Sequence, residues 1–145
     1  MSTSNLTELE KGTEIGSLVQ QFVYRIPKKN HDRMQQITAQ DNDIFRKHGV
    51  LRSEAFQLTN TNILMEGFVN ISNIVSADPD EEVWMELQAY RDRKHLDEVK
   101  AKCGKDENMG RLYKESLDLL TPGTSFILGE FGRLSIWTLL ADGNR

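Results

Sequence analysis

The chain contains 145 residues, with 22 acidic and 18 basic side chains, so its formal net charge at neutral pH is −4. This is the length of one domain that can bury a core of its own, and the mildly negative charge, without a basic stripe among aromatic residues, argues against nucleic acid as a partner. The single cysteine, Cys103, excludes an intramolecular disulfide and a CxxC metal or redox site, which fits a reducing compartment.

The first 15 residues are polar and rich in Ser, Thr and Glu, which predicts a mobile N-terminal tail. They lack the apolar core of a signal peptide, and no run elsewhere approaches the ~20 apolar residues of a membrane span. We therefore expect a soluble, cytoplasmic protein that does not enter a membrane.

The next 45 or so residues are predicted to form a strand, a helix and a second strand. Residues 17–27 are rich in β-branched and aromatic side chains on both faces, which predicts a central strand that Pro27 ends. In residues 30–49 apolar side chains recur at helical spacing before Gly49, which indicates a helix that covers the sheet. Residues 50–60 alternate only weakly, as expected of an edge strand.

The remainder of the chain is predicted to contain a strand, two helices and a last strand. Residues 60–80 include a turn rich in Asp and Pro and no clear element, after which the alternation of "EEVWMELQAY" predicts a strand. Two amphipathic helices and a final strand are then expected in residues 91–103, 107–120 and 124–134. Residues 135–145 form an extension whose apolar side chains need a cover.

This order of elements predicts an α+β fold of the ferredoxin-like βαββαβ kind, a four-stranded antiparallel sheet with the helices on one face. We expect one such domain over residues 16–134, between the tail of residues 1–15 and the extension of residues 135–145. The other face of the sheet is left bare, so it needs solvent or a second molecule as its cover.

The strand over residues 81–90 has two unlike faces. One carries Val83, Met85, Leu87 and Ala89, and the other carries Trp84, Glu86, Gln88 and Tyr90. We expect the helices to cover the first face and to leave the second bare. Because a bare face with aromatic side chains is an apolar patch that marks an interface, the sequence predicts a homodimer stacked sheet to sheet. Such a dimer, a dimeric α+β barrel, buries on the order of 1,600 Å² around a lumen suited to a ligand.

Four blocks of the sequence, "FRKHGVLR", "DPDEEV", "RKHLDEVKAK" and "ILGEF", resemble the corresponding blocks of the small, uncharacterised bacterial YbaA-like family. The resemblance covers roughly residues 17–134. That family is similar in fold to the dimeric α+β barrel group, which includes cofactor-free monooxygenases, haem-degrading enzymes, chlorite dismutases and stress-responsive proteins. The resemblance implies the fold and a dimer, and it implies no activity, because the family has no established one.

The chain departs from the family pattern at four positions. The family has a small residue, an aromatic residue, a small residue and glycine where this chain has Asp41, His48, Glu86 and Glu130. Any function common to the family could therefore be altered in this chain.

Glu86, with Trp84, Gln88 and Tyr90 around it, is the first candidate for function. A carboxyl group in a partly desolvated lumen has a raised pKa and can act as a general base, and the neighbouring side chains would bind the ligand. The alternative is that these residues form a wet dimer interface, where Trp and Tyr are common.

Three further residues are candidates for the same lumen. His95 could act as an acid or base at its mouth, or belong to a charge cluster on the surface of the second helix. Asp41 and His48 share the apolar stripe of the first helix, so they could bind a ligand in the lumen or flank the stripe and reach solvent.

No cofactor is indicated. The three histidines have no HxH, HExxH or Cys/His spacing, so we expect no metal site, and the glycines of "GEFG" form no phosphate loop. The sequence favours a homodimer that binds a small apolar or aromatic molecule between its sheets. A cofactor-independent monooxygenase or isomerase with Glu86 or His95 as base is the alternative, and a structural dimer without ligand is a further one.

Overall fold

The computed structural model describes residues 16–134. Its elements follow the order that the sequence predicts. The long ones are β1 (Leu18–Pro27), α2 (His31–Lys47), β2 (Arg52–Gln57), β3 (Glu81–Tyr90), α4 (Arg93–Gly104), α5 (Glu107–Leu119) and β4 (Ile127–Gly132), and the short ones are the 3₁₀ turn η2 (Lys28–Asn30) and α3 (Ile71–Ile74). The four strands form one antiparallel sheet in the order β2-β3-β1-β4. This confirms the predicted fold class, with β1 in the interior of the sheet and β2 at an edge.

Local signals in the sequence determine where the helices begin and end. Helix α2 ends before Gly49, which has a positive φ of 103° that favours glycine. The Asp92 and Asp106 side chains cap the first turns of α4 and α5, because they accept hydrogen bonds from the backbone N–H groups of His95 and Asn108. Among the described helices, none is long and apolar enough to cross a membrane.

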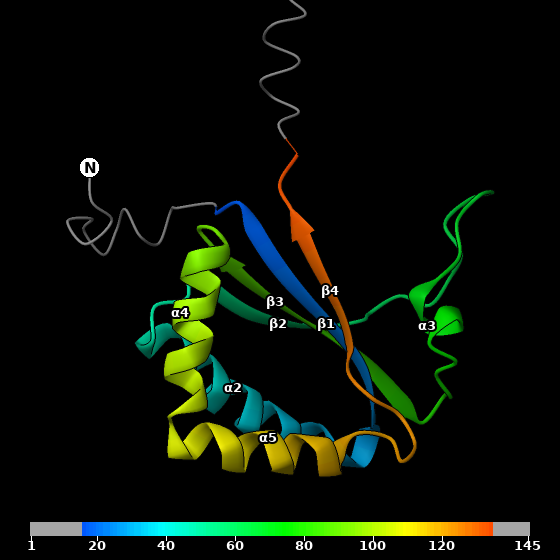
Figure 1. Ribbon diagram of the computed structural model, residues 1–145. Helices are drawn as coiled ribbons and strands as arrows, with labels where there is room; N and C mark the ends of the chain where they lie inside the picture. Colours follow the sequence, from blue (N-terminus) through cyan, green and yellow to red (C-terminus); the bar gives the residue numbers. More distant parts are fainter. Residues whose placement is uncertain (1–15, 135–145) are drawn as a thin grey trace, which may run out of the picture.

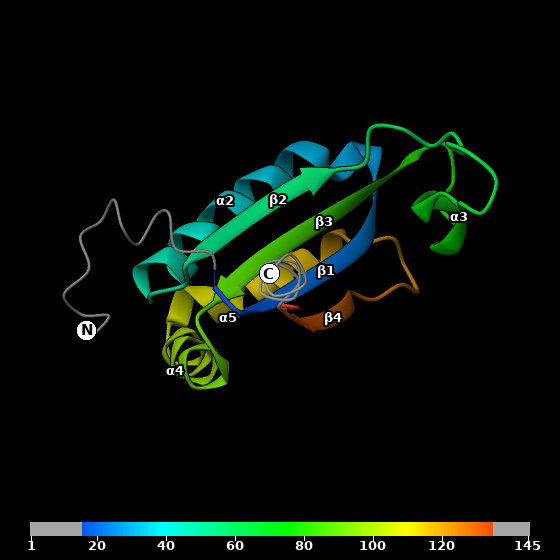
Figure 2. The same ribbon diagram turned by 90° about the horizontal axis from the view of Figure 1, so that it is seen from above.

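Helices α2, α4 and α5 all lie on the same side of the sheet, with α5 beside α2 (Figure 1). From above, the strands lie in front of these helices and present their other face to the viewer (Figure 2). We call this second side the open face. The β2–β3 connection, which contains α3, reaches one end of it, where Arg25 Nη1 donates a hydrogen bond to Ser76 O at 2.6 Å.

The predicted assignment of faces on β3 was wrong. Trp84 and Tyr90 point toward the helices, where only 5% and 0% of their surface is exposed. Leu87 and Met85 belong to the open face, as do Phe56 and Phe131, which are 47% and 54% exposed. The reason lies in the register with β1: Tyr24 and Phe22 stand opposite Trp84 and Glu86, so the larger side chains of both strands meet on one side.

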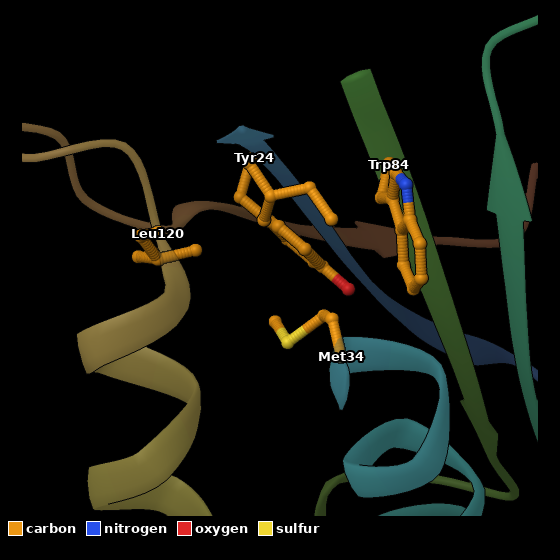
Figure 3. Close-up of a cluster of buried hydrophobic side chains, with 5 residues drawn as sticks. Tyr24, Met34, Trp84 and Leu120 are labelled. Carbon is orange, nitrogen blue, oxygen red and sulfur yellow. The ribbon is translucent and has the colours of Figure 1, made fainter. Parts of the chain in front are cut away.

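Two clusters of buried side chains hold the helices on the sheet. The first consists of Tyr24, Ile26, Met34, Trp84 and Leu120, and the second of Val50, Tyr90, Leu96, Val99 and Cys103. Figure 3 shows the first cluster, in which side chains from β1, β3, α2 and the end of α5 converge. Since Trp84 and Tyr90 belong to different clusters, the middle of β3 lies between the two.

Candidate functional site

The middle of the helix-covered face is not filled by side chains. A cavity of about 350 Å³ lies between the sheet and helices α2, α4 and α5, within one chain. Its walls are mostly apolar, formed by Phe22, Phe45, Met109, Tyr113, Phe126 and Leu128, with Asp41, Glu86, Gln88, Lys100 and Ser116 as the polar residues. This volume falls in the range of ligand sites, and so does the combination of apolar walls with a few polar groups.

The row of side chains on β3 explains the position of the cavity. Trp84 and Tyr90, at the ends of the row, are packed into the two clusters, whereas Glu86 and Gln88 in the middle line the cavity. The polar parts of both aromatic side chains are satisfied locally: Trp84 Nε1 donates to Glu82 Oε1 at 2.9 Å, and Tyr90 Oη donates to Gln88 Oε1 at 2.7 Å. The cavity is therefore a gap between two packed regions rather than a lumen between two sheets.

Two carboxyl groups line the cavity, and the charge of one acts on the other. Glu86 comes from β3 and Asp41 from α2. Burial, and secondly the charge of Glu86, raises the pKa of Asp41 to about 7. Burial also raises the pKa of Glu86, an effect that the Tyr24 hydroxyl opposes. Near neutral pH the Asp41 carboxyl group is therefore protonated in a substantial share of molecules, so it can donate as well as accept hydrogen bonds.

The polar atoms around this pair are incompletely satisfied. Asp41 Oδ1 is buried and has no hydrogen-bond partner among the described residues, and the Tyr24 hydroxyl lies beside Glu86. The Tyr24 ring itself is fixed, since it packs edge-on against Phe126, with 4.9 Å between the ring centroids. Because a buried polar atom without a partner costs about 1–3 kcal/mol, the arrangement favours a guest that supplies the missing hydrogen bond.

A single amine lies at the Gln88 part of the cavity. Lys100 of α4 places Nζ 3.4 Å from Gln88 Oε1, and 5.5 Å and 5.1 Å from the ring centroids of Phe22 and Phe45. Both rings are within the distance at which an aromatic face attracts a cation. Burial lowers the pKa of Lys100.

The remaining predicted site residues lie elsewhere. His48 follows the end of α2 and pairs with Asp106, with 3.0 Å between Nε2 and Oδ2. His95 is buried, and both of its ring nitrogens are occupied: Nδ1 accepts a hydrogen bond from the Arg91 backbone N–H at 3.0 Å, and Nε2 lies 2.8 Å from Gly49 O. Burial lowers the pKa of His95. Neither imidazole lines the cavity.

The sequence analysis named Asp41, Glu86 and Gln88 as candidates for the same site, and all three line the cavity. It did not name Lys100, which belongs to the amphipathic helix predicted in residues 91–103. A signal was available, because Lys100 lies four residues after Leu96 and three before Cys103, on the apolar stripe.

A metal centre has no support in the described part of the chain. No group of three or more His, Cys, Asp or Glu side chains within residues 16–134 could hold a metal ion. Besides Asp41 and Glu86, the cavity is lined by the amide of Gln88 and the hydroxyl of Ser116. Amides and hydroxyls are groups that can form hydrogen bonds with organic molecules.

Comparison with known proteins gives a family. None of the curated proteins matches the chain. Among solved structures, the chain is similar to Rv0793 from Mycobacterium tuberculosis, with 16% identity, a TM-score of 0.49 and coverage of 82% of this chain and 97% of the other. A NIPSNAP family protein from Agrobacterium tumefaciens matches with 11% identity, a TM-score of 0.48 and coverage of 84% and 90%. The family model described as "Protein of unknown function (DUF1428)" matches residues 17–118, and the chain belongs to this family.

Proposed function

We propose that the chain binds a small organic molecule in the cavity between the sheet and helices α2, α4 and α5. The body of this ligand is apolar or aromatic, to suit the walls, and one of its polar groups forms hydrogen bonds with Asp41 and Glu86. One observation carries the proposal: a buried carboxyl oxygen without a partner, Asp41 Oδ1, belongs to a side chain that lines an apolar cavity of about 350 Å³. The ligand is thus assigned to the inside of each chain, and not to a space between two sheets.

Binding can be tested with a panel of neutral phenols and aromatic amides, followed by calorimetry and by amide chemical shifts of Glu86 and Gln88. Ser116→Phe places a ring in the cavity and should abolish binding, because Ser116 is buried and lines it. Leu117→Phe is the matched control, since the neighbouring side chain is 41% exposed and lies outside the cavity. Circular dichroism checks that both variants fold. If no member of a broad panel binds, the proposal fails.

An enzymatic role is the second candidate, and the Asp41–Glu86 pair favours it. A carboxyl group with a pKa of about 7 beside a second one is suited to take a proton from a bound molecule and to return it at neutral pH. A cofactor-independent oxygenase or isomerase needs a base of this kind. For any ligand found to be turned over, Glu86→Gln should abolish turnover and retain binding. Unchanged turnover would remove Glu86 from the mechanism.

We also propose that two chains associate through their open faces, as the resemblance to the YbaA-like family and the dimeric α+β barrels suggests. The open face carries Phe56, Ile127 and Phe131, all about half exposed, beside Leu87 and Val19. Phe131→Glu should convert a dimer into a monomer in analytical ultracentrifugation, while Leu117→Glu on α5 should not. A wild-type monomer would exclude the association. A dimer that binds no aromatic molecule would instead support a purely structural role.

A further inference from the structure

Within residues 16–134, no carboxylate pairs with the amine of Lys100. It forms no ion pair with any residue in the described range, and its hydrogen bond to Gln88 is long, at 3.4 Å. Two acidic groups act on Lys100 at longer range, first the Cys103 thiol and then the Glu130 carboxylate. That carboxylate is already used: Arg93 Nη2 lies 2.5 Å from Glu130 Oε2, and Gln20 Nε2 donates to Glu130 Oε1 at 2.7 Å. An ammonium group in a mostly apolar cavity therefore has a site open for an anion.

The amine of Lys100 and the carboxyl groups of Asp41 and Glu86 line different parts of the same cavity. Lys100 contacts Gln88, whereas the charge of Glu86 acts on Asp41. Glu86 and Gln88 are two residues apart on the same face of β3. The Cα atoms of two such residues are about 6.6 Å apart, so a benzene ring with polar substituents at opposite positions is long enough to reach from the Gln88 part of the cavity to the Glu86 part. The Phe22 ring belongs to the same region, because Phe22 is paired with Glu86 in the sheet and lies under Lys100.

We propose that the ligand of this cavity is an aromatic acid. Its ionised oxygen pairs with the Lys100 ammonium, its ring lies against Phe22 and Phe45, and a hydroxyl or carbonyl group on the opposite side of the ring forms hydrogen bonds with Asp41 and Glu86. This inference rests on the proposed function, and it specifies the chemical class of the ligand.

The test compares 4-hydroxybenzoate with 4-hydroxybenzamide, which has the same shape without the charge, by calorimetry at a pH just below neutral. We expect the acid to bind wild-type protein about tenfold more tightly than the amide. In Lys100→Met, which keeps the apolar stem, the two probes should bind equally. The matched control is Lys114→Met on α5, which removes one positive charge from outside the cavity and should leave the tenfold difference intact.

The outcomes separate this inference from the proposed function. If acid and amide bind wild-type protein equally, or if the preference for the acid persists in Lys100→Met, the inference is wrong and binding in the cavity still stands. If neither probe nor any neutral phenol binds, the cavity is not a ligand site and both proposals fall. The comparison of the two probes on wild-type protein decides the matter even if Lys100→Met does not fold.

Discussion

The two ends of the β3 row and its middle have the same alternating geometry but different surroundings. At the ends, Trp84 and Tyr90 are packed into clusters and their polar atoms find partners within two residues. In the middle, Glu86 and Gln88 face a cavity, and the neighbouring Asp41 keeps an oxygen without a partner. One strand can therefore both hold the helices and present a site, because position along the strand decides between core and cavity.

The largest effect on stability is expected from replacing Trp84, at one end of the row. Trp84→Ala removes the largest side chain of its cluster and leaves a hole next to Tyr24 and Met34, so it should lower the free energy of unfolding by ~3–5 kcal/mol. Urea denaturation followed by circular dichroism measures this. Leu117→Ala, at a half-exposed position on α5, should cost less than about 1 kcal/mol. Equal losses in the two variants would show that Trp84 does not belong to a packed core.

Replacing Asp41, which lines the cavity beside the middle of the row, should have the opposite effect and stabilise the protein at high pH. The folded-state pKa of Asp41, about 7, lies above its ordinary value, so between about pH 4 and 7 the folded chain binds more protons than the unfolded chain. This group therefore stabilises the fold least at high pH: its contribution declines as pH rises through that window and stays low above it. Asp41→Asn should remove this decline and stabilise the protein at pH 8 by on the order of 2 kcal/mol, less than the full shift because the cavity is partly open.

Thermal unfolding of wild type and Asp41→Asn across this pH range checks the sign. The two curves should converge below about pH 4, where the carboxyl group becomes protonated in the unfolded chain as well as in the folded one. Asp43→Asn, on the same helix but with a side chain 79% exposed, should leave the pH dependence of the wild type unchanged. An Asp41→Asn protein that is less stable at pH 8 would mean that the ionised carboxylate has a partner.

The fold could be predicted from the sequence because its signals are local. Periodicity and end signals, such as Gly49 after α2, fix each element without knowledge of the others. The faces of β3 could not be assigned in the same way, because alternation shows that a strand has two faces and not which one meets the helices. That depends on the register that places Tyr24 opposite Trp84, and register is a long-range property.

The candidate site was predictable only in part for a similar reason. Asp41 and Glu86 could be noticed within single elements, because a carboxyl group at a position surrounded by apolar ones is unusual in a helix or a strand. Their proximity, by contrast, depends on how α2 crosses the sheet. Lys100 was overlooked because a lysine on an amphipathic helix usually reaches solvent, and only the position of Phe22 and Phe45 shows that its amine lines a cavity.

Gln88 joins the two regions, and the smallest predicted effect tests that link. Its Oε1 accepts a hydrogen bond from the buried Tyr90 hydroxyl on the cluster side and lies 3.4 Å from Lys100 Nζ on the cavity side. Gln88→Leu leaves the Tyr90 hydroxyl without this acceptor, which should cost about 1–2 kcal/mol, whereas removing the hydroxyl as well should cancel much of that penalty.

A double-mutant cycle measures the link between the cluster and the cavity. Gln88→Leu, Tyr90→Phe and the double variant should show a coupling of roughly 1 kcal/mol in urea denaturation, with the double variant more stable than Gln88→Leu alone. Additive costs, within about 0.5 kcal/mol, would mean that the hydroxyl finds another acceptor when Gln88 is lost.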